Sequence, residues 1–210
     1  MKRLVLLIAI GLLLGCSSTR LVESWKNPQS TTFNPNKLLV VGMTEHISAR
    51  TLFEQKLSAE LASRGFNIVK SLDIFSPDFT HAKKTEEDIS VLVKMLRDKG
   101  FDAVMVTAIK GIEKKKVVRR EYYNIYSRRH GFRDYYFINQ DIYFHPEYYD
   151  IYKIYHVETS LYNISSDDER SLVWIGYIDI IDPSTVTDTV DDYVKEIITS
   201  LEKEGVVKKL

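Results

Sequence analysis

The chain has 210 residues, 44% hydrophobic and 28% charged, and its 29 basic and 29 acidic side chains leave no net charge. This balance does not point to a nucleic acid or an anionic membrane surface as a partner. The length suits one domain with a sizeable core rather than two, and a single cysteine excludes an internal disulfide.

The first 15 residues have the pattern of a signal peptide. Lys2 and Arg3 precede an apolar run over residues 4–14, which ends at Gly15. As a helix this run rises only about 16 Å, roughly half of the ~30 Å hydrocarbon core of a bilayer. The sequence therefore predicts a segment that is removed, not a permanent membrane span.

The only cysteine follows this run directly. Leu13-Leu14-Gly15-Cys16 resembles the lipobox of bacterial lipoproteins, although Leu14 is a less usual residue at its position. The resemblance implies cleavage before Cys16, a diacylglycerol on its sulfur and a further acyl chain such as palmitate on its amine, which together hold a protein on a membrane. Ser17 stands where an inner-membrane retention signal has Asp, so the resemblance implies the outer membrane. The alternative is an uncleaved signal with an incidental free cysteine.

Residues 16–36 are expected to form a lipidated tether, and residues 37–210 a single periplasmic domain. The tether is rich in Ser, Thr, Asn and Pro, which are typical of irregular chain. Fully extended it reaches at most about 70 Å, so the domain stays near its membrane.

The first part of the domain predicts a βαβαβ unit. Three short apolar runs rich in branched residues are typical of buried strands. They cover residues 37–43, 66–69 and 101–109. Between them, apolar residues recur at helical spacing after Ser48 and after Thr85, with Gly65 and Gly100 at the expected helix ends. Thr85 and Asp88 form an approximate capping box.

Regular structure returns near the C-terminus. Residues 156–164 and 171–181 predict an antiparallel hairpin around a polar loop. A last helix follows Pro183, and its apolar stripe should dock on the sheet. The predicted fold class is α/β: a small mixed sheet that starts as a parallel βαβαβ unit and continues as an antiparallel hairpin, with helices packed on it. A long Tyr-rich hairpin or loop insertion covers residues 111–155.

This insertion is rich in tyrosine and arginine and is the most unusual part of the chain. Tyrosine presents apolar area with a polar tip, and arginine binds carboxylates in a forked geometry, so the combination suits a protein interface or a glycan surface. The alternative is a long twisted hairpin that aromatic cross-strand pairs merely stabilise. The residues expected to contact an envelope protein or a second copy of the chain are Arg119, Arg120, Tyr122, Tyr123, Arg128 and Arg129.

No catalytic or cofactor motif stands out. The sequence contains neither a phosphate-binding Gly-Lys-Ser/Thr loop nor a Gly-x-Ser-x-Gly motif, and its five histidines form no metal-binding pair. We therefore expect no enzyme activity, no cofactor and no metal. Two alternatives stay open. One is a periplasmic hydrolase that uses His145, Glu147 or His156. The other is a small-ligand sensor that uses the loops after the parallel strands, near Gly42, Ser71 and Lys110.

Several fragments of the chain carry a family resemblance. They are Cys16, Ser24-Trp25-Lys26-x-Pro28, Val40-Val41-Gly42, Phe53-Glu54-x-x-Leu57-x-x-Glu60-Leu61-x-x-Arg64-Gly65, Phe101-Asp102-Ala103, Thr159-x-Leu161-Tyr162 and Leu172-Val173-Trp174. Together they resemble a group of small, largely uncharacterised bacterial lipoproteins with an α/β periplasmic domain. The last two fragments also resemble, more weakly, curli-secretion-type and penicillin-binding-protein-activator lipoproteins, whose domains work by protein contact or assembly. The resemblance implies an outer-membrane-anchored periplasmic lipoprotein that binds or assembles with envelope components, and Cys16 is the only functional residue that it maps.

Overall fold

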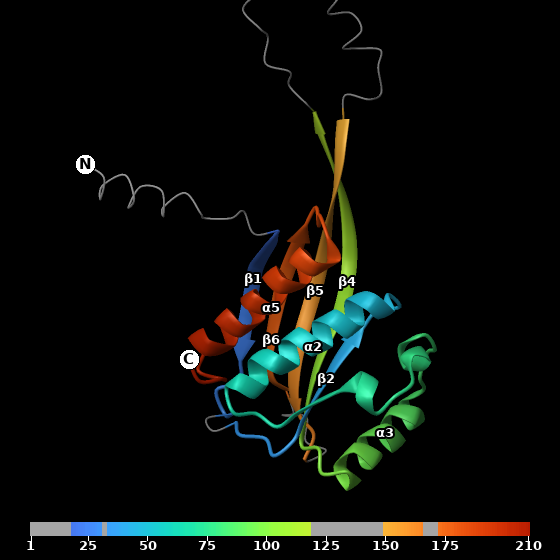
Figure 1. Cartoon of the computed structure of the whole chain (residues 1–210), viewed down its shortest axis with the longest axis vertical. Coiled ribbons are helices and arrows are strands. Elements are labelled where there is room, and N and C mark those ends of the chain that lie inside the picture. The colour runs from blue at the N-terminus through green and yellow to red at the C-terminus, as the bar shows by residue number, and fades with distance from the viewer. Residues whose placement is uncertain (1–17, 31–32, 119–148, 166–171) are drawn as a thin grey trace, which may run out of the picture.

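Within the residues that the structure describes, six strands form one mixed sheet in the order β1-β6-β5-β4-β2-β3 (Figure 1). The computed structural model describes residues 18–30, 33–118, 149–165 and 172–210. The strands are β1 (Thr19–Lys26), β2 (Leu38–Met43), β3 (Ile68–Lys70), β4 (Ala103–Val118), β5 (Tyr149–Asn163) and β6 (Leu172–Ile181). The helices are α2 (Ile47–Ser63), α3 (Glu86–Asp98) and α5 (Val186–Lys203), with short 3-10 helices η1 (Ser71–Asp73) and η2 (Pro77–Thr80). The predicted α/β class with a mixed sheet is confirmed.

The half of the sheet built from β2, β3 and β4 is parallel, as the βαβαβ pattern predicts. Gly65 and Gly100 follow α2 and α3 with φ of 94° and 80°, a left-handed conformation that favours glycine. α3 begins with the predicted capping box, in which Thr85 Oγ1 accepts from Asp88 N at 3.1 Å and Asp88 Oδ2 accepts from Thr85 N at 2.9 Å. The other half is antiparallel, and the predicted hairpin of β5 and β6 is confirmed.

Helices pack on both faces of the sheet, two on one face and one on the other. α2 and α5 lie side by side on one face, and α3 covers the parallel strands on the other (Figure 1). The larger core, between the sheet and the helix pair, is built around Leu57, Leu61, Trp174, Ile197 and Leu201, none of which exposes more than 1% of its surface. The apolar stripe of α5 therefore docks on the sheet as predicted, and this burial is the main source of stability.

Strand β1 corrects the prediction that residues 16–36 are a tether. Residues 19–26 pair antiparallel with β6 and form one edge of the sheet. Ser24 Oγ donates to the Glu204 carboxylate, and Lys26 Nζ donates to the Glu204 backbone oxygen at 3.1 Å. The folded domain thus begins well before the predicted boundary, because β6 offers backbone N–H and C=O groups that an extended segment satisfies.

The strands β4 and β5 project beyond the rest of the sheet as a two-stranded ribbon (Figure 1). β4 pairs with β2 only as far as Ala108, and the pairing of β5 with β6 begins at Ile154, yet β4 and β5 stay paired to Val118 opposite Tyr149. Both ends of the predicted 111–155 insertion are therefore strands of the sheet. We call residues 112–118 paired with residues 149–155 the arm.

Candidate functional site

The carboxyl ends of parallel strands are where open α/β sheets most often bind ligands. Here β2 and β4 point toward the end of the molecule from which the arm projects (Figure 1). α2 begins there directly after β2, and α5 begins there after β6. The arm and two helix N-termini thus lie at the same end of the domain as the carboxyl ends of the parallel strands.

A small apolar pocket of about 120 Å³ lies at this end between α2, α5 and the sheet. Its walls include Gly42, Phe53, Val157, Val190 and Tyr193. The rings of Phe53 and Tyr193 meet at a centroid distance of 6.0 Å and an angle of 55°. A β-carbon at position 42 would lie 3.2 Å from Phe53, so glycine keeps room for that ring. The expected loop near Gly42 therefore does line a pocket.

The other two loops expected for a ligand sensor do not contribute to this pocket. Ser71 lies in η1, and its hydroxyl donates a hydrogen bond to the buried carboxylate of Glu54. Lys110 lies past the pocket on β4, and its ammonium is 3.6 Å from Glu158. Of the three loops that the sequence predicted to form a ligand site, only the loop near Gly42 thus lines this pocket.

Two residues that line the pocket, Thr107 and Tyr193, share a hydrogen-bonded chain of three hydroxyl groups with Thr159. Thr159 Oγ1 lies 2.6 Å from Thr107 Oγ1 and 2.8 Å from the Tyr193 hydroxyl. Burial raises the pKa of the Tyr193 phenol well above its ordinary value of 10.0. The hydrogen bonds to Thr159 and Thr107 lower the pKa, but their effect is smaller than that of burial. The phenol therefore stays neutral and acts as a hydrogen-bonding group. Sequence reasoning missed Tyr193, although it lies on the same helical stripe as Val190 and Val194.

Beside the pocket, α2 carries a buried ion pair that the sequence analysis did not identify. Arg50 is 1% exposed and Glu54 is 0% exposed, and Arg50 Nε lies 3.0 Å from Glu54 Oε1. The carboxylate also accepts from the Gly42 N–H at 3.0 Å, the Leu72 N–H at 3.1 Å and the Ser71 hydroxyl at 2.5 Å. The guanidinium also donates to Ser71 Oγ, to the Pro77 carbonyl and to Thr80 Oγ1.

This cluster holds the loops against α2. Buried charges are tolerated only when they are paired and hydrogen-bonded, and the Glu54 oxygens already accept four hydrogen bonds. We therefore assign Arg50 and Glu54 to structure, not to acid–base chemistry. One sequence signal was present, because both residues fall on the helical face of Phe53, Leu57 and Leu61.

His156, one of the three residues of the hydrolase alternative, lies on the other face of the sheet. Its neighbour Val157 lines the pocket, and successive residues of a strand point to opposite faces. His156 Nδ1 is 2.7 Å from Asp179 Oδ1, and Asp179 also pairs with Arg20 at 3.3 Å. Glu113 lies 3.9 Å from the second ring nitrogen, so polar side chains from four neighbouring strands contact one another on this face. Its partners in the alternative, His145 and Glu147, lie outside the described residues.

The residues predicted for anchoring and partner contact also lie outside the described residues. They are Cys16 and the set Arg119, Arg120, Tyr122, Tyr123, Arg128 and Arg129. The structure nevertheless shows the arm that leads to the latter set, since residues 119–148 connect Val118 to its ladder partner Tyr149. In the described ranges, no helix is long and apolar enough to cross a membrane, and no three His, Cys, Asp or Glu side chains converge as around a metal ion.

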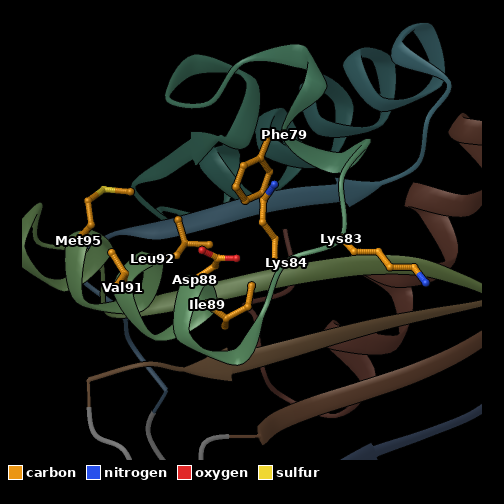
Figure 2. A pocket seen from close by; sticks show the side chains of 8 residues that line it. All are labelled: Phe79, Lys83, Lys84, Asp88, Ile89, Val91, Leu92 and Met95. Carbon is orange, nitrogen blue, oxygen red and sulfur yellow. The ribbon is translucent and has the colours of Figure 1, made fainter.

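A second hollow, of about 390 Å³, lies between α3 and η2 (Figure 2). Its lining residues are Phe79, Lys83, Lys84, Asp88, Ile89, Val91, Leu92 and Met95. Figure 2 shows the Lys84 side chain turned toward Phe79, and its ammonium lies 5.2 Å from the ring centre. Hydrogen bonds from the backbone and hydroxyl of Thr85 lower the pKa of Asp88, whose carboxylate caps the helix. Because this carboxylate is committed to the cap, the lining residues offer no acid–base pair.

Comparison with known proteins gives distant likenesses in fold. No family model matches the chain, and no curated protein is similar to it in sequence. The PelC dodecamer from Paraburkholderia phytofirmans is similar at 11% identity and a TM-score of 0.45, over 87% of this chain and 96% of that chain. Lipoprotein GNA1162 from Neisseria meningitidis is similar at 13% identity and a TM-score of 0.43, over 80% of this chain and 99% of that chain. The expected likeness to small bacterial lipoproteins is thus distant and concerns the fold alone.

Proposed function

We propose that this chain is an outer-membrane lipoprotein whose periplasmic domain is a non-catalytic module for binding or assembly with other envelope components. The run Leu13-Leu14-Gly15-Cys16, followed by Ser17, supports the anchor. Acylation of Cys16 would hold the chain on its membrane essentially permanently, because each buried methylene contributes about 0.8 kcal/mol.

The arm is the observation that carries the binding part of this proposal. An isolated two-stranded ribbon buries little apolar surface and is only marginally stable by itself. A ribbon that continues to Val118 and Tyr149, past the last pairing with β2 and β6, therefore suits a contact element better than a core element. Its strands lead directly into the Tyr/Arg-rich segment, whose side chains suit a carboxylate-bearing or apolar partner.

Photocrosslinking in whole cells tests the partner. A photoreactive residue in place of Tyr123 should give adducts with an envelope component or a second copy of the chain, whereas one in place of Val91 on α3, which is 65% exposed, should not. Replacing the six predicted contact residues together with serine should remove the adducts. If the same adducts form in that variant, or form equally at position 91, the segment is not the contact site.

Mass spectrometry of the intact protein, combined with membrane fractionation, tests the anchor. The wild-type chain should begin at Cys16, carry acyl mass and sediment with the outer membrane. The Cys16→Ala variant should lack the acyl mass and leave that fraction. An uncleaved or unmodified wild-type chain would contradict the anchor.

The pocket favours a second candidate function, a sensor of a small apolar ligand. Its walls are mostly apolar, and the Thr107 and Tyr193 hydroxyls lie beside them. Native mass spectrometry of protein extracted from cells should then show a bound small molecule. The Ala49→Phe variant, which fills the pocket, should lose that mass. Spectra of the wild-type protein without added mass would count against the sensor.

A further inference from the structure

The described chain begins at the end of the sheet from which the arm projects. Ser18 is fixed there, since its N–H donates to Asp192 Oδ2 at 2.9 Å and its carbonyl accepts from Ile181 N at 2.7 Å. Cys16 stands two positions earlier in the sequence. Because consecutive Cα atoms are 3.8 Å apart, the Cα atoms of Cys16 and Ser18 lie within about 8 Å of each other. An acyl group on Cys16 would therefore lie close to this end of the domain, without a long tether.

Strand register shows how far the arm extends past the anchor. Thr19 pairs with Ile180, Ile180 with Tyr155, and Tyr155 with Ile112, so the four residues form one row across the sheet. From this row β4 continues to Val118, about 20 Å at ~3.4 Å per residue. The headgroup layer on one side of a bilayer is only about 5–8 Å deep. Cys16 stands three positions before Thr19, so its Cα atom lies within about 11 Å of this row. A membrane that is held there, at the end where the arm projects, is therefore reached by the outer part of the arm.

One face of the arm has side chains that suit such a contact. Lys114 stands directly opposite Lys153 in the ladder, and the rows of Ile112 and Ile151 flank this pair on the same face. The isoleucines are 56% and 57% exposed. Like charges directly opposite each other destabilise an antiparallel pair, and none of the described carboxylates forms an ion pair with either lysine.

An anionic phospholipid headgroup provides the charge that this face lacks. Its phosphate neutralises the opposed ammonium groups, while the apolar lysine stems and the isoleucines lie against the interface. The chain as a whole has no net charge, so the attraction is local to the arm. We propose that the face formed by Ile112, Lys114, Ile151 and Lys153 docks on anionic headgroups of the membrane that holds the Cys16 acyl chains. This inference rests on the proposed lipid anchor and makes the bilayer a partner of the arm.

The test places a reporter on the arm of the acylated, full-length mature protein. Ile151→Cys and, as a matched control, Val91→Cys on α3 each receive an environment-sensitive fluorophore, while the lipid blocks the native thiol of Cys16. The proteins are reconstituted into vesicles of phosphatidylcholine with phosphatidylglycerol, and into vesicles of phosphatidylcholine alone. With phosphatidylglycerol, the reporter at position 151 should shift to the blue and be quenched by headgroup-linked quenchers. The reporter at position 91 should keep its emission in water.

Charge removal then tests the lysines. Lys114→Gln together with Lys153→Gln should lower the ratio of docked to free arm about 25-fold on phosphatidylglycerol vesicles, at about fivefold per lysine. The Lys→Arg pair should keep docking, and an unchanged melting temperature shows that the fold is intact. If the protein floats with the vesicles but both reporters stay in water, docking is overturned and the anchor stands. If the protein does not float, the anchor fails and the inference fails with it.

Discussion

Replacing Gly176 with alanine should destabilise the fold, because the ring of Trp174 lies directly on this glycine. A β-carbon at position 176 would lie 2.4 Å from Trp174 Cη2 and 2.7 Å from its Cζ2. Favourable carbon–carbon contacts are about 3.5–4.0 Å long. Trp174 is 0% exposed and belongs to the larger core, so the rigid ring cannot move without displacing its neighbours.

Overpacking of this kind costs typically about 1–3 kcal/mol, and overlap with two atoms of a rigid ring favours the upper half of that range. We expect the free energy of unfolding to fall by about 2–3 kcal/mol and the melting temperature by about 4–12 °C. Urea unfolding measures this loss, and its slope should stay unchanged if the variant is otherwise native. Gly111→Ala is the matched control, since a β-carbon there would lie 3.8 Å from His156, an ordinary contact.

A second variant separates ring overlap from a general preference for glycine in this strand. In a Trp174→Phe background the ring is smaller, so the added cost of Gly176→Ala should fall below about 1 kcal/mol. An equal loss for Gly111→Ala and Gly176→Ala, or a full loss in the Phe background, would refute the overlap as the cause.

The remaining predictions concern the buried ion pair and the buried phenol. Glu54→Gln leaves Arg50 buried without a counter-charge and should cost about 3–5 kcal/mol in urea unfolding, whereas Glu60→Gln, in a partly exposed pair on the same helix, should cost under about 1 kcal/mol. Similar losses would contradict the buried role. Burial raises the folded-state pKa of Tyr193, so its stabilising contribution is complete below about pH 10 and is lost as the pH rises further. Tyr193→Phe should therefore lose stability less steeply than the wild type above about pH 10; parallel curves of unfolding free energy against pH would show that the phenol does not contribute.

Most elements could be predicted because their signals act over a few residues. Gly65 and Gly100 were each expected to end a helix, and each has positive φ. The capping box at Thr85 was read from two side chains three positions apart and is present. The start of α2 was less accurate, because it begins at Ile47 and the position before it makes no side-chain cap bond.

Strand β1 was missed because its alternation is broken and its partner is distant in the chain. The register shifts between Leu21 and Glu23, so apolar residues do not alternate evenly along the strand. Its partner β6 begins at Leu172, well over a hundred residues later. The segment also lies in a stretch rich in Ser, Thr and Asn, and composition alone favoured a tether.

Arg50 and Glu54 show the same limit for the candidate site. A charged pair four positions apart on a helix is usually solvent-exposed, and sequence reasoning passed over it. The 3-10 helices η1 and η2 bury the pair by supplying Ser71, Pro77 and Thr80. No periodic pattern in those loops predicts where they pack.

Local sequence was thus enough for the α/β class, the order of the helices and most strands, and the candidate lipidation signal at Cys16. The tertiary structure decided that Ser18 and the arm lie at one end of the domain, that Arg50 is buried and that His156 faces away from the pocket. The physical reason is range. Caps, turns and hydrophobic periodicity act within one element, whereas strand pairing and burial depend on which distant segments meet.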